Sequence, residues 1–242
     1  MSRLPKNEDP SSSATLWLLD GSDLQDNDLK FFAARLSASE KRRFANFTRT
    51  ARRRQFLLGR MLLRFAVANL TGLASDQFSV VEKSDNPPQL TFRDRRLLSP
   101  KFSLSHSDDW VACAISVAAT LGVDIEVNKA NRDVASISDV AFHPSEQIWL
   151  GSQPRTERIP AFYSLWCAKE ALYKLLCNLN QESDASPLVG QAGRHHYQLP
   201  VADLGLTAVV FSDRPLSAIH QRILRGFSSA DWMVVAENCC GS

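Results

Sequence analysis

The chain has 242 residues, of which 44% are hydrophobic and 22% are charged, and its formal net charge is +2. This composition is typical of a soluble globular protein, and the chain is long enough to bury a hydrophobic core. The apolar runs are short and interrupted by charges, which excludes a membrane span, and the N-terminus has no signal-peptide pattern, so we expect a cytoplasmic protein.

The first third of the chain shows helix and strand signals between polar segments. Residues 1–14 are polar and rich in proline and serine, which predicts a flexible N-terminal arm before a short buried strand at 15–20. Ser37 and Glu40 have the spacing of a capping box, which predicts the start of a helix. A longer helix should follow it and end at Gly72.

Strand signals dominate the middle of the chain. A strand is predicted at 78–83, and the sequence SDNPP after it predicts a turn. Residues 102–117 predict two strands joined by a polar turn at 106–109. The next segment, 120–127, alternates hydrophobic residues with two acids, which should therefore share one face of a strand.

The C-terminal part combines helices and strands. Pro144 indicates the start of a helix, and a second helix is predicted at about 163–179 from its apolar stripe. Strands are predicted at 197–201, 206–213 and 232–238.

The two long helices resemble each other weakly. Each has two charged residues four positions apart, which are Glu170 and Lys174 in the second helix, and each has strands on both sides. This repeat predicts an α+β fold of two pseudo-symmetric halves, residues 15–118 and 119–242. Each half should be a small, mainly antiparallel sheet packed on a long helix, with the active site at the interface of the halves.

Three acids could converge on one metal ion. Asp124 and Glu126 are two positions apart on a predicted strand, and Glu170 follows 44 residues later on a helix. Three oxygen ligands suit Mg²⁺, which also accepts phosphate oxygens. A strand with one solvated face would also explain the first two acids, so the residues alone leave both interpretations open.

Two other features have a structural and a functional interpretation. Glu170 and Lys174 could be an ordinary surface ion pair on a helix, or an acid and a base held for chemistry. His106, flanked by Ser105 and Ser107, could be a structural histidine or part of a phosphate-binding turn.

One segment of the chain is strongly basic. Residues 35–64 contain ten Lys or Arg residues and one acid, Glu40. This asymmetry predicts an acidic partner, which could be a phosphate group, an acidic protein or nucleic acid. A solvated helix face is the simpler explanation of the same charges.

Three short sequences, taken together, resemble the Sfp-type 4'-phosphopantetheinyl transferases. They are FSLSHS at 102–107, GVDIE at 122–126 and WCAKEALYK at 166–174. The family has a histidine strand, then a GxDxE strand, then a helix with the pattern W/F-x-x-K-E-x-x-x-K. The resemblance implies a two-lobed fold, and because two fused halves need no partner subunit, we expect a monomer.

The resemblance also implies a reaction. The enzyme would move the 4'-phosphopantetheine arm of coenzyme A to a serine of an acyl, peptidyl or aryl carrier protein and release 3',5'-ADP. Asp124, Glu126 and Glu170 would hold Mg²⁺ together with the pyrophosphate of coenzyme A. Glu170 would remove the proton from the attacking serine, and Lys174 would stabilise the leaving group.

Further residues would contact the nucleotide and the carrier protein. Ser105 and His106 would lie at the nucleotide end, with His106 at the 3'-phosphate. The candidates for the 3'-phosphate and for docking an acidic carrier helix are Lys41, Arg43, Arg53 and Arg60. One departure is that the family commonly has Gly-Lys-Pro before the histidine strand, whereas this chain has Asp85-Asn86-Pro87-Pro88 and lacks that lysine.

Two other functions remain open at the level of the sequence. The basic segment 35–64 could bind nucleic acid, but the three acids would then be unexplained, since acids repel a phosphate backbone. A catalytically inactive relative could bind carrier proteins only, although the intact acids argue against it. Under the transferase interpretation, we expect no nucleic-acid partner and no membrane partner.

Overall fold

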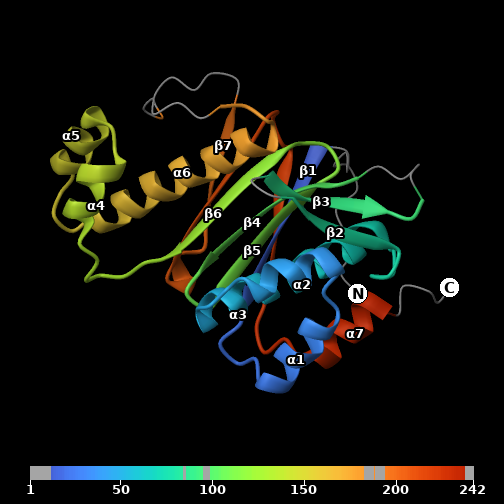
Figure 1. Ribbon diagram of the computed structural model, residues 1–242. Helices are drawn as coiled ribbons and strands as arrows, with labels where there is room; N and C mark the ends of the chain where they lie inside the picture. Colours follow the sequence, from blue (N-terminus) through green and yellow to red (C-terminus); the bar gives the residue numbers. More distant parts are fainter. Residues whose placement is uncertain (1–11, 84–85, 95–98, 183–187, 189–193, 238–242) are drawn as a thin grey trace.

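Two sheets, each packed against one long helix, form the body of the protein (Figure 1). The computed structural model describes residues 12–83, 86–94, 99–182, 188 and 194–237. The first sheet has the order β4 (Lys101–Ser107), β5 (Trp110–Ser116), β1 (Ser13–Asp20) and β9 (Ala218–Leu224). The second has the order β6 (Leu121–Val127), β8 (Leu206–Ser212) and β7 (His195–Leu199), and β2 (Phe78–Lys83) pairs with β3 (Asn86–Phe92) in a separate two-stranded sheet.

Helices α3 (Thr50–Thr71) and α6 (Arg158–Asn178) are the two long helices. The shorter helices are α1 (Asp26–Ala34), α2 (Ala38–Ala45), α4 (Val134–Ala141), α5 (Pro144–Ser152) and α7 (Ser229–Glu237), with a 3₁₀ turn at Ala202–Leu204. In the described part of the chain, no helix is long and apolar enough to cross a membrane.

Alternating side chains on β1 connect the layers. Trp17 and Leu19 face the core that contains α3, whereas Leu16 and Leu18 face the second sheet. Successive side chains of a strand point to opposite faces, so one strand can contribute to both cores. The resulting order of layers is α3, first sheet, second sheet and α6.

Several predicted elements are confirmed. The α+β class holds, because helices are combined with small, mostly antiparallel sheets. Both bonds of the capping box between Ser37 and Glu40 are present at the start of α2, and Gly72 ends α3 in the left-handed conformation with φ 69°. Strand β2 has the predicted bounds, and α5 begins at Pro144.

Other predictions are wrong. The segment at 232–238 was expected to be a strand but lies mostly in α7, because Ser228 and Asp231 hydrogen-bond at its start and Trp232 is buried against Phe31 and Phe32. Pro87 and Pro88 lie in strand β3 rather than in a turn. The turn after β4 begins at Asp108, which has φ 48°, so His106 is still in the strand.

Three further boundaries differ from expectation. Strand β1 begins at Ser13, inside the expected flexible arm, and residues 1–11 of that arm lie outside the described residues. Helix α6 begins at Arg158, five residues earlier than expected. Strand β9 pairs in parallel with β1, so the first sheet contains residues from both expected halves. The division into two pseudo-symmetric halves stays a prediction.

Gly122 on β6 allows α6 to pack directly on the second sheet. A Cβ atom at this position would lie 2.0 Å from the backbone oxygen of Ala171 and 2.5 Å from the backbone nitrogen of Leu175. Both obstacles are helix backbone, which cannot rotate away as a side chain could. The glycine of the GVDIE sequence is therefore required by close packing.

We expect Gly122→Ala to lower the free energy of unfolding by about 2 kcal/mol or more, because overpacking a well-packed core typically costs 1–3 kcal/mol. Urea unfolding followed by circular dichroism measures the change. Gly151→Ala in α5 is the matched control, since no atom lies within 4 Å of its added Cβ. Equal effects of the two substitutions would contradict the packing argument.

Candidate active site

The two sheets meet along β4 and β6. These strands do not pair through their backbones, and serine side chains of β4 instead form hydrogen bonds with the backbone of β6. The hydroxyl oxygens of β4 accept hydrogen bonds from backbone N–H groups of β6: Ser103 from Val123 at 3.0 Å, Ser105 from Ile125 at 3.3 Å and Ser107 from Val127 at 3.0 Å. The three serines alternate along β4, so their hydroxyls share one face. We call these three contacts the serine seam.

Two serines of the seam also hold acids. Ser105 Oγ donates to Asp124 Oδ1 at 2.7 Å, and Ser107 Oγ donates to Glu126 Oε2 at 2.8 Å. Val123 and Ile125 lie instead in the apolar layer between the sheets, as their alternation with the acids predicts. The acids of β6 are therefore anchored side chains and not a freely solvated strand face.

Helix α6 contributes a lysine, a tryptophan and an acid. Lys174 Nζ donates to Asp124 Oδ1 at 2.7 Å and to Ser105 Oγ at 3.0 Å. Trp166 Nε1 donates to Glu126 Oε1 at 3.0 Å. The ion pair of Lys174 thus joins α6 to β6 and is not a surface contact within the helix.

Negative charge is concentrated around Asp124. Burial raises the pKa of Glu170, and the charge of Asp124 raises it further, while Lys174 opposes this shift. Burial also raises the pKa of Glu126, against a hydrogen bond from Ser107, and the charge of Asp124 again adds to the rise. A proton or a nearby cation would reduce the unfavourable negative charge of both acids.

Asp124 has an oxygen that could bind a cation. Its Oδ2 is buried and has no hydrogen-bond partner, which is costly for a carboxylate. Divalent cations such as Mg²⁺ bind carboxylate oxygens, so this atom fits a metal. However, no group of three or more His, Cys, Asp or Glu side chains in the described residues is arranged to hold a metal ion. The complete three-acid ligand set stays a prediction.

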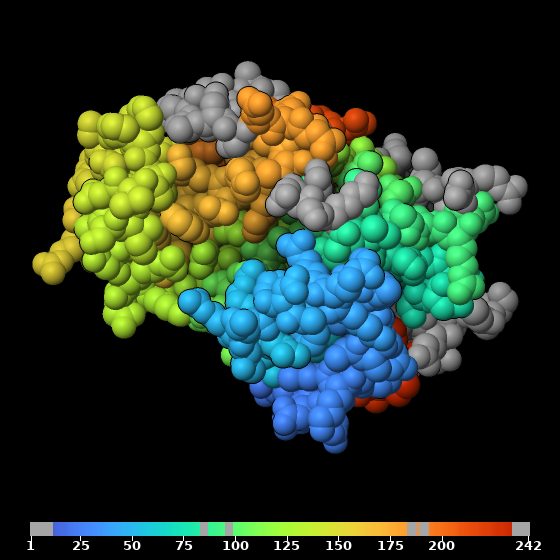
Figure 2. Space-filling model, in the orientation of Figure 1, coloured from blue at the N-terminus to red at the C-terminus, as the bar shows by residue number. Residues whose placement is uncertain are grey.

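A cavity of about 980 Å³ opens beside these residues, between α3, β4 and α6. Figure 2 shows the surface hollowed between the blue helices of the N-terminal part and the orange helix α6. Five of the predicted ligand-contact residues line it, namely Arg43, Arg60, Ser105, His106 and Lys174. Lys41 and Arg53 do not line it; both are exposed, and the Arg53 guanidinium lies 4.5 Å from the ring centroid of Phe44.

His106 is paired with Arg52 at the cavity wall. Arg52 Nη1 hydrogen-bonds with His106 Nε2, and because arginine can only donate, Nε2 is the acceptor and Nδ1 carries the proton. The His106 side chain is exposed to the cavity, but the protein around the ring removes part of its hydration, which lowers its pKa to about 4, and the charges of Arg52 and Lys174 contribute to the shift. The imidazole is therefore neutral at neutral pH.

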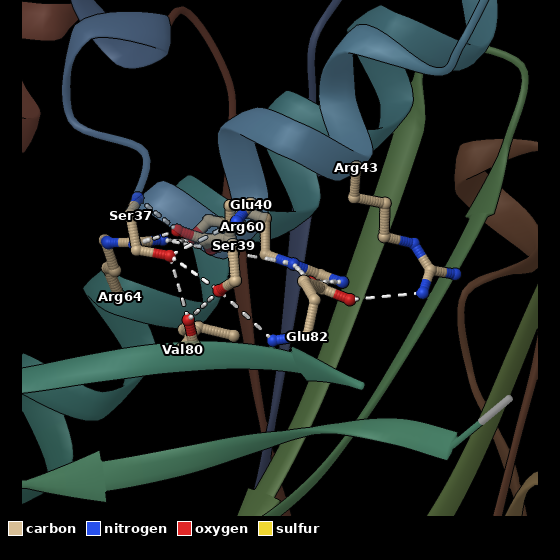
Figure 3. A network of polar contacts seen from close by, with 8 residues as sticks. All are labelled: Ser37, Ser39, Glu40, Arg43, Arg60, Arg64, Val80 and Glu82. Atoms are coloured by element: carbon tan, nitrogen blue, oxygen red, sulfur yellow. Dashed lines mark hydrogen bonds and ion pairs between the residues drawn. The ribbon is translucent and has the colours of Figure 1, made fainter. Parts of the chain in front are cut away.

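A buried ion-pair network forms the wall behind the cavity (Figure 3). Glu40 binds Arg64 with oxygen–nitrogen distances of 2.9 and 2.5 Å, and Glu82 Oε1 lies 2.5 Å from Arg60 Nη2. Arg43 reaches Glu82 from the exposed side at 3.3 Å. Arg60, predicted to bind the 3'-phosphate, therefore reaches the cavity already paired with an acid.

Arg42, Arg52 and Tyr173 line the cavity but were not expected there. A signal for Arg52 exists in the sequence. Gln55 and Gly59 follow it at intervals of three and seven, so a single helix face carries all three residues, and all three line the cavity. Choosing Arg52 from three consecutive arginines requires knowing where the cavity is.

Comparisons with known proteins match two parts of the chain to family models. The protein-family model described as 4'-phosphopantetheinyl transferase superfamily matches residues 120–189. A second family model, described as 4'-phosphopantetheinyl transferase, N-terminal, matches residues 24–118. The chain is 31% identical to the 4'-phosphopantetheinyl transferase HetI of Nostoc sp. over 63% of this chain and 64% of that protein.

Two other relatives are the 4'-phosphopantetheinyl transferases gsp of Aneurinibacillus migulanus and psf-1 of Bacillus pumilus. The chain is 27% identical to gsp over 60% of this chain and 58% of gsp. It is 35% identical to psf-1 over 50% of this chain and 49% of psf-1. The chain thus spans about half to two thirds of the length of these curated relatives.

We expect Glu40→Gln to lower the free energy of unfolding by about 3 kcal/mol, because breaking a buried ion pair leaves Arg64 without its counter-charge. Thermal and urea unfolding measure this change. Asp76→Asn is the control, since Asp76 pairs with Arg93 at 3.6 Å on the exposed surface and should contribute little. Similar losses in the two variants would contradict the expected cost of leaving Arg64 buried without its counter-charge.

We expect the stability of the protein to decrease between pH 6.5 and pH 4 through His106. In this range the unfolded chain, whose histidine has a pKa near 6.5, binds a proton that folded His106 with a pKa of about 4 does not bind. The free energy of unfolding is thus unaffected by His106 above pH 6.5 and falls as the pH approaches 4. His106→Gln should show a shallower decrease in urea unfolding across this range, and parallel curves would contradict the neutral state.

Proposed function

The chain belongs to the 4'-phosphopantetheinyl transferase superfamily, and we propose that it transfers the 4'-phosphopantetheine arm of coenzyme A to a serine of a carrier protein, releasing 3',5'-ADP. The observation that carries this proposal is the meeting of Asp124, Lys174 and Ser105 at the edge of the cavity. An acid, a cation and a hydroxyl from three separate elements converge there. Such a constellation beside a large cavity supports phosphoryl transfer, in which a cation and an acid that can hold a metal ion stabilise the charge of the transferred group.

We propose that Asp124 and Glu170, together with Glu126, hold Mg²⁺. The partnerless Asp124 Oδ2 and the raised pKa values of Glu126 and Glu170 support this ligand set. Bound Mg²⁺ would neutralise charge on the phosphoryl group that is attacked.

Glu170 and Lys174 have separate roles in this proposal. A carboxylate with a raised pKa accepts a proton more readily, so Glu170 suits the removal of the proton from the incoming serine hydroxyl. Lys174 lines the cavity and brings positive charge to the site, which would favour the phosphate oxygens of the departing 3',5'-ADP.

The cavity suits the anionic end of coenzyme A. Its volume of about 980 Å³ lies at the upper end of ligand sites in proteins. The basic residues on its wall are Arg42, Arg43, Arg52, Arg60 and Lys174, and Glu82 is the only acid among the described residues that line it. These arginines can compensate for the lysine that the chain lacks in the sequence Asp85-Asn86-Pro87-Pro88. Lys41 and Arg53 are exposed, so both are accessible to an acidic carrier protein.

The structure supports nucleic-acid binding by residues 35–64 less well than it supports the transferase function. Arg60 and Arg64 are buried in ion pairs, and the guanidinium of Arg35 stacks on Phe31 at 3.4 Å. These side chains cannot join one exposed basic face.

Mass spectrometry of apo carrier proteins incubated with coenzyme A and Mg²⁺ tests the proposed function. We expect one phosphopantetheine arm to be added, and EDTA to prevent the addition. Asp124→Asn and Glu170→Gln should each lower the rate by more than about 100-fold, since loss of a ligand should exceed the 10- to 100-fold cost of losing an outer partner.

The matched control is Glu157→Gln, which changes an exposed acid just before α6 and should leave the rate unchanged. Circular dichroism establishes that each variant is folded. Absence of the added mass across fatty-acid, polyketide and peptide carriers would end the transferase interpretation.

A further inference from the structure

The hydroxyl of Ser105 already makes every hydrogen bond that a hydroxyl can make. A serine hydroxyl has one proton to donate and two lone pairs. Ser105 donates to Asp124 Oδ1 at 2.7 Å, and it accepts from the Ile125 backbone N–H at 3.3 Å and from Lys174 Nζ at 3.0 Å. Although Ser105 borders the cavity, it is 5% exposed. A nucleotide could contact this hydroxyl only by displacing one of the three partners.

Ser107, two residues further along β4, also donates to a carboxylate and accepts from a backbone N–H group of β6. Its hydroxyl donates to Glu126 Oε2 at 2.8 Å and accepts from the Val127 N–H at 3.0 Å. Glu126 is held from its other oxygen by Trp166, so the carboxylate is fixed from both sides. The orientation of this acid is therefore set by β4 and α6 together, and Arg132, in the segment after β6, adds an ion pair at 3.7 Å.

Ser103 is the third serine of the seam, and it differs from the other two in its contacts. Its hydroxyl accepts from the Val123 N–H at 3.0 Å, and the side chain lies on the same face of β4 as those of Ser105 and Ser107. Its described contact is with the backbone of β6, whereas the other two serines also hold a carboxylate. The three serines thus share one structural role, and two of them have a second role.

We propose that Ser105 and Ser107 are positioning residues that fix the carboxylates of Asp124 and Glu126 for a divalent cation, and that Ser105 also fixes Lys174. This assigns Ser105 to the metal side of the site rather than to the nucleotide. The serine seam and the metal-binding acids are then one structure, because the hydroxyls that join the sheets also orient the ligands. The inference rests on the proposed function, since it takes the acids of β6 to be metal ligands.

Mn²⁺ binding, measured by electron paramagnetic resonance without substrate, tests the positioning role. Ser105→Ala and Ser103→Ala both remove a partner of a β6 N–H group, but only Ser105→Ala releases a carboxylate. We expect Ser105→Ala to weaken Mn²⁺ binding by about 10-fold or more, as for other outer partners of metal ligands. Ser103→Ala should leave the Mn²⁺ affinity close to that of the wild type, and Ser105→Thr, which keeps the hydroxyl, should restore it.

Calorimetric titration of coenzyme A in EDTA tests the second half of the proposal. Without metal, Ser105→Ala should bind coenzyme A nearly as the wild type does, because Lys174 keeps its ion pair with Asp124 and the Ser105 hydroxyl has no hydrogen bond left for the nucleotide. In assays with Mg²⁺, the same substitution should lower kcat and change the KM for coenzyme A little. A weaker metal-free affinity for coenzyme A, with unchanged Mn²⁺ binding, would instead place Ser105 at the nucleotide.

The remaining outcomes are also decisive. Ser107→Ala, at a half-buried position, provides a second measurement if Ser105→Ala does not fold, and it should also weaken Mn²⁺ binding. Equal Mn²⁺ affinities of the Ser105→Ala, Ser107→Ala and Ser103→Ala variants, with transfer intact in the wild type, would overturn the positioning role and leave the transferase standing. A wild-type protein that binds no Mn²⁺ and transfers no arm would overturn both.

Discussion

Hydrogen bonds from β6 to the serine hydroxyls of β4 determine how the two sheets meet, and the site depends on that junction. The apolar layer between the sheets, with Leu16 and Ile125 among its members, supplies attraction without direction. Such a layer does not by itself fix how one strand lies along another. A shift of one residue would turn Ile125 outward and Asp124 into the apolar layer, and the hydroxyl contacts, spaced by two residues, oppose that shift.

The position of α6 depends on a second constraint, the missing side chain at Gly122. Ala171 and Leu175 of α6 lie against this glycine, and Glu170 and Lys174 immediately precede them in the sequence. The distance between helix and strand therefore sets how close Glu170 and Lys174 come to Asp124. The opposite effects of Asp124 and Lys174 on the pKa of Glu170 follow from that closeness, because charges interact strongly in a partly buried site.

Local signals in the sequence were sufficient for much of the fold. The capping box of Ser37, the C-terminal Gly72 and the alternation around Ile125 each act over a few residues, and each is confirmed. The errors have tertiary causes. The apolar run after Trp232 is short enough to suit a strand or a helix, and burial of that tryptophan beside α1 accompanies the helical outcome. Likewise, the sequence identified Asp124 as a candidate ligand, but it could not show that Ser105 on another sheet has no hydrogen bond left for a substrate.

The charge of the cavity also depends on tertiary pairing. The composition shows ten basic residues between positions 35 and 64, without showing which of them have counter-charges. Glu40 forms an ion pair with Arg64, and Glu82 forms one with Arg60. These two ion pairs connect α2 and β2 to α3 (Figure 3). Removing such groups from water is costly, and buried pairs often contribute little net stability compared with apolar packing. Their effect on the site is geometric, because Arg43 is held at the cavity wall by the same Glu82 that pairs with buried Arg60. A basic segment that looks uniform in the sequence is thereby divided into a structural part and a part that faces the cavity.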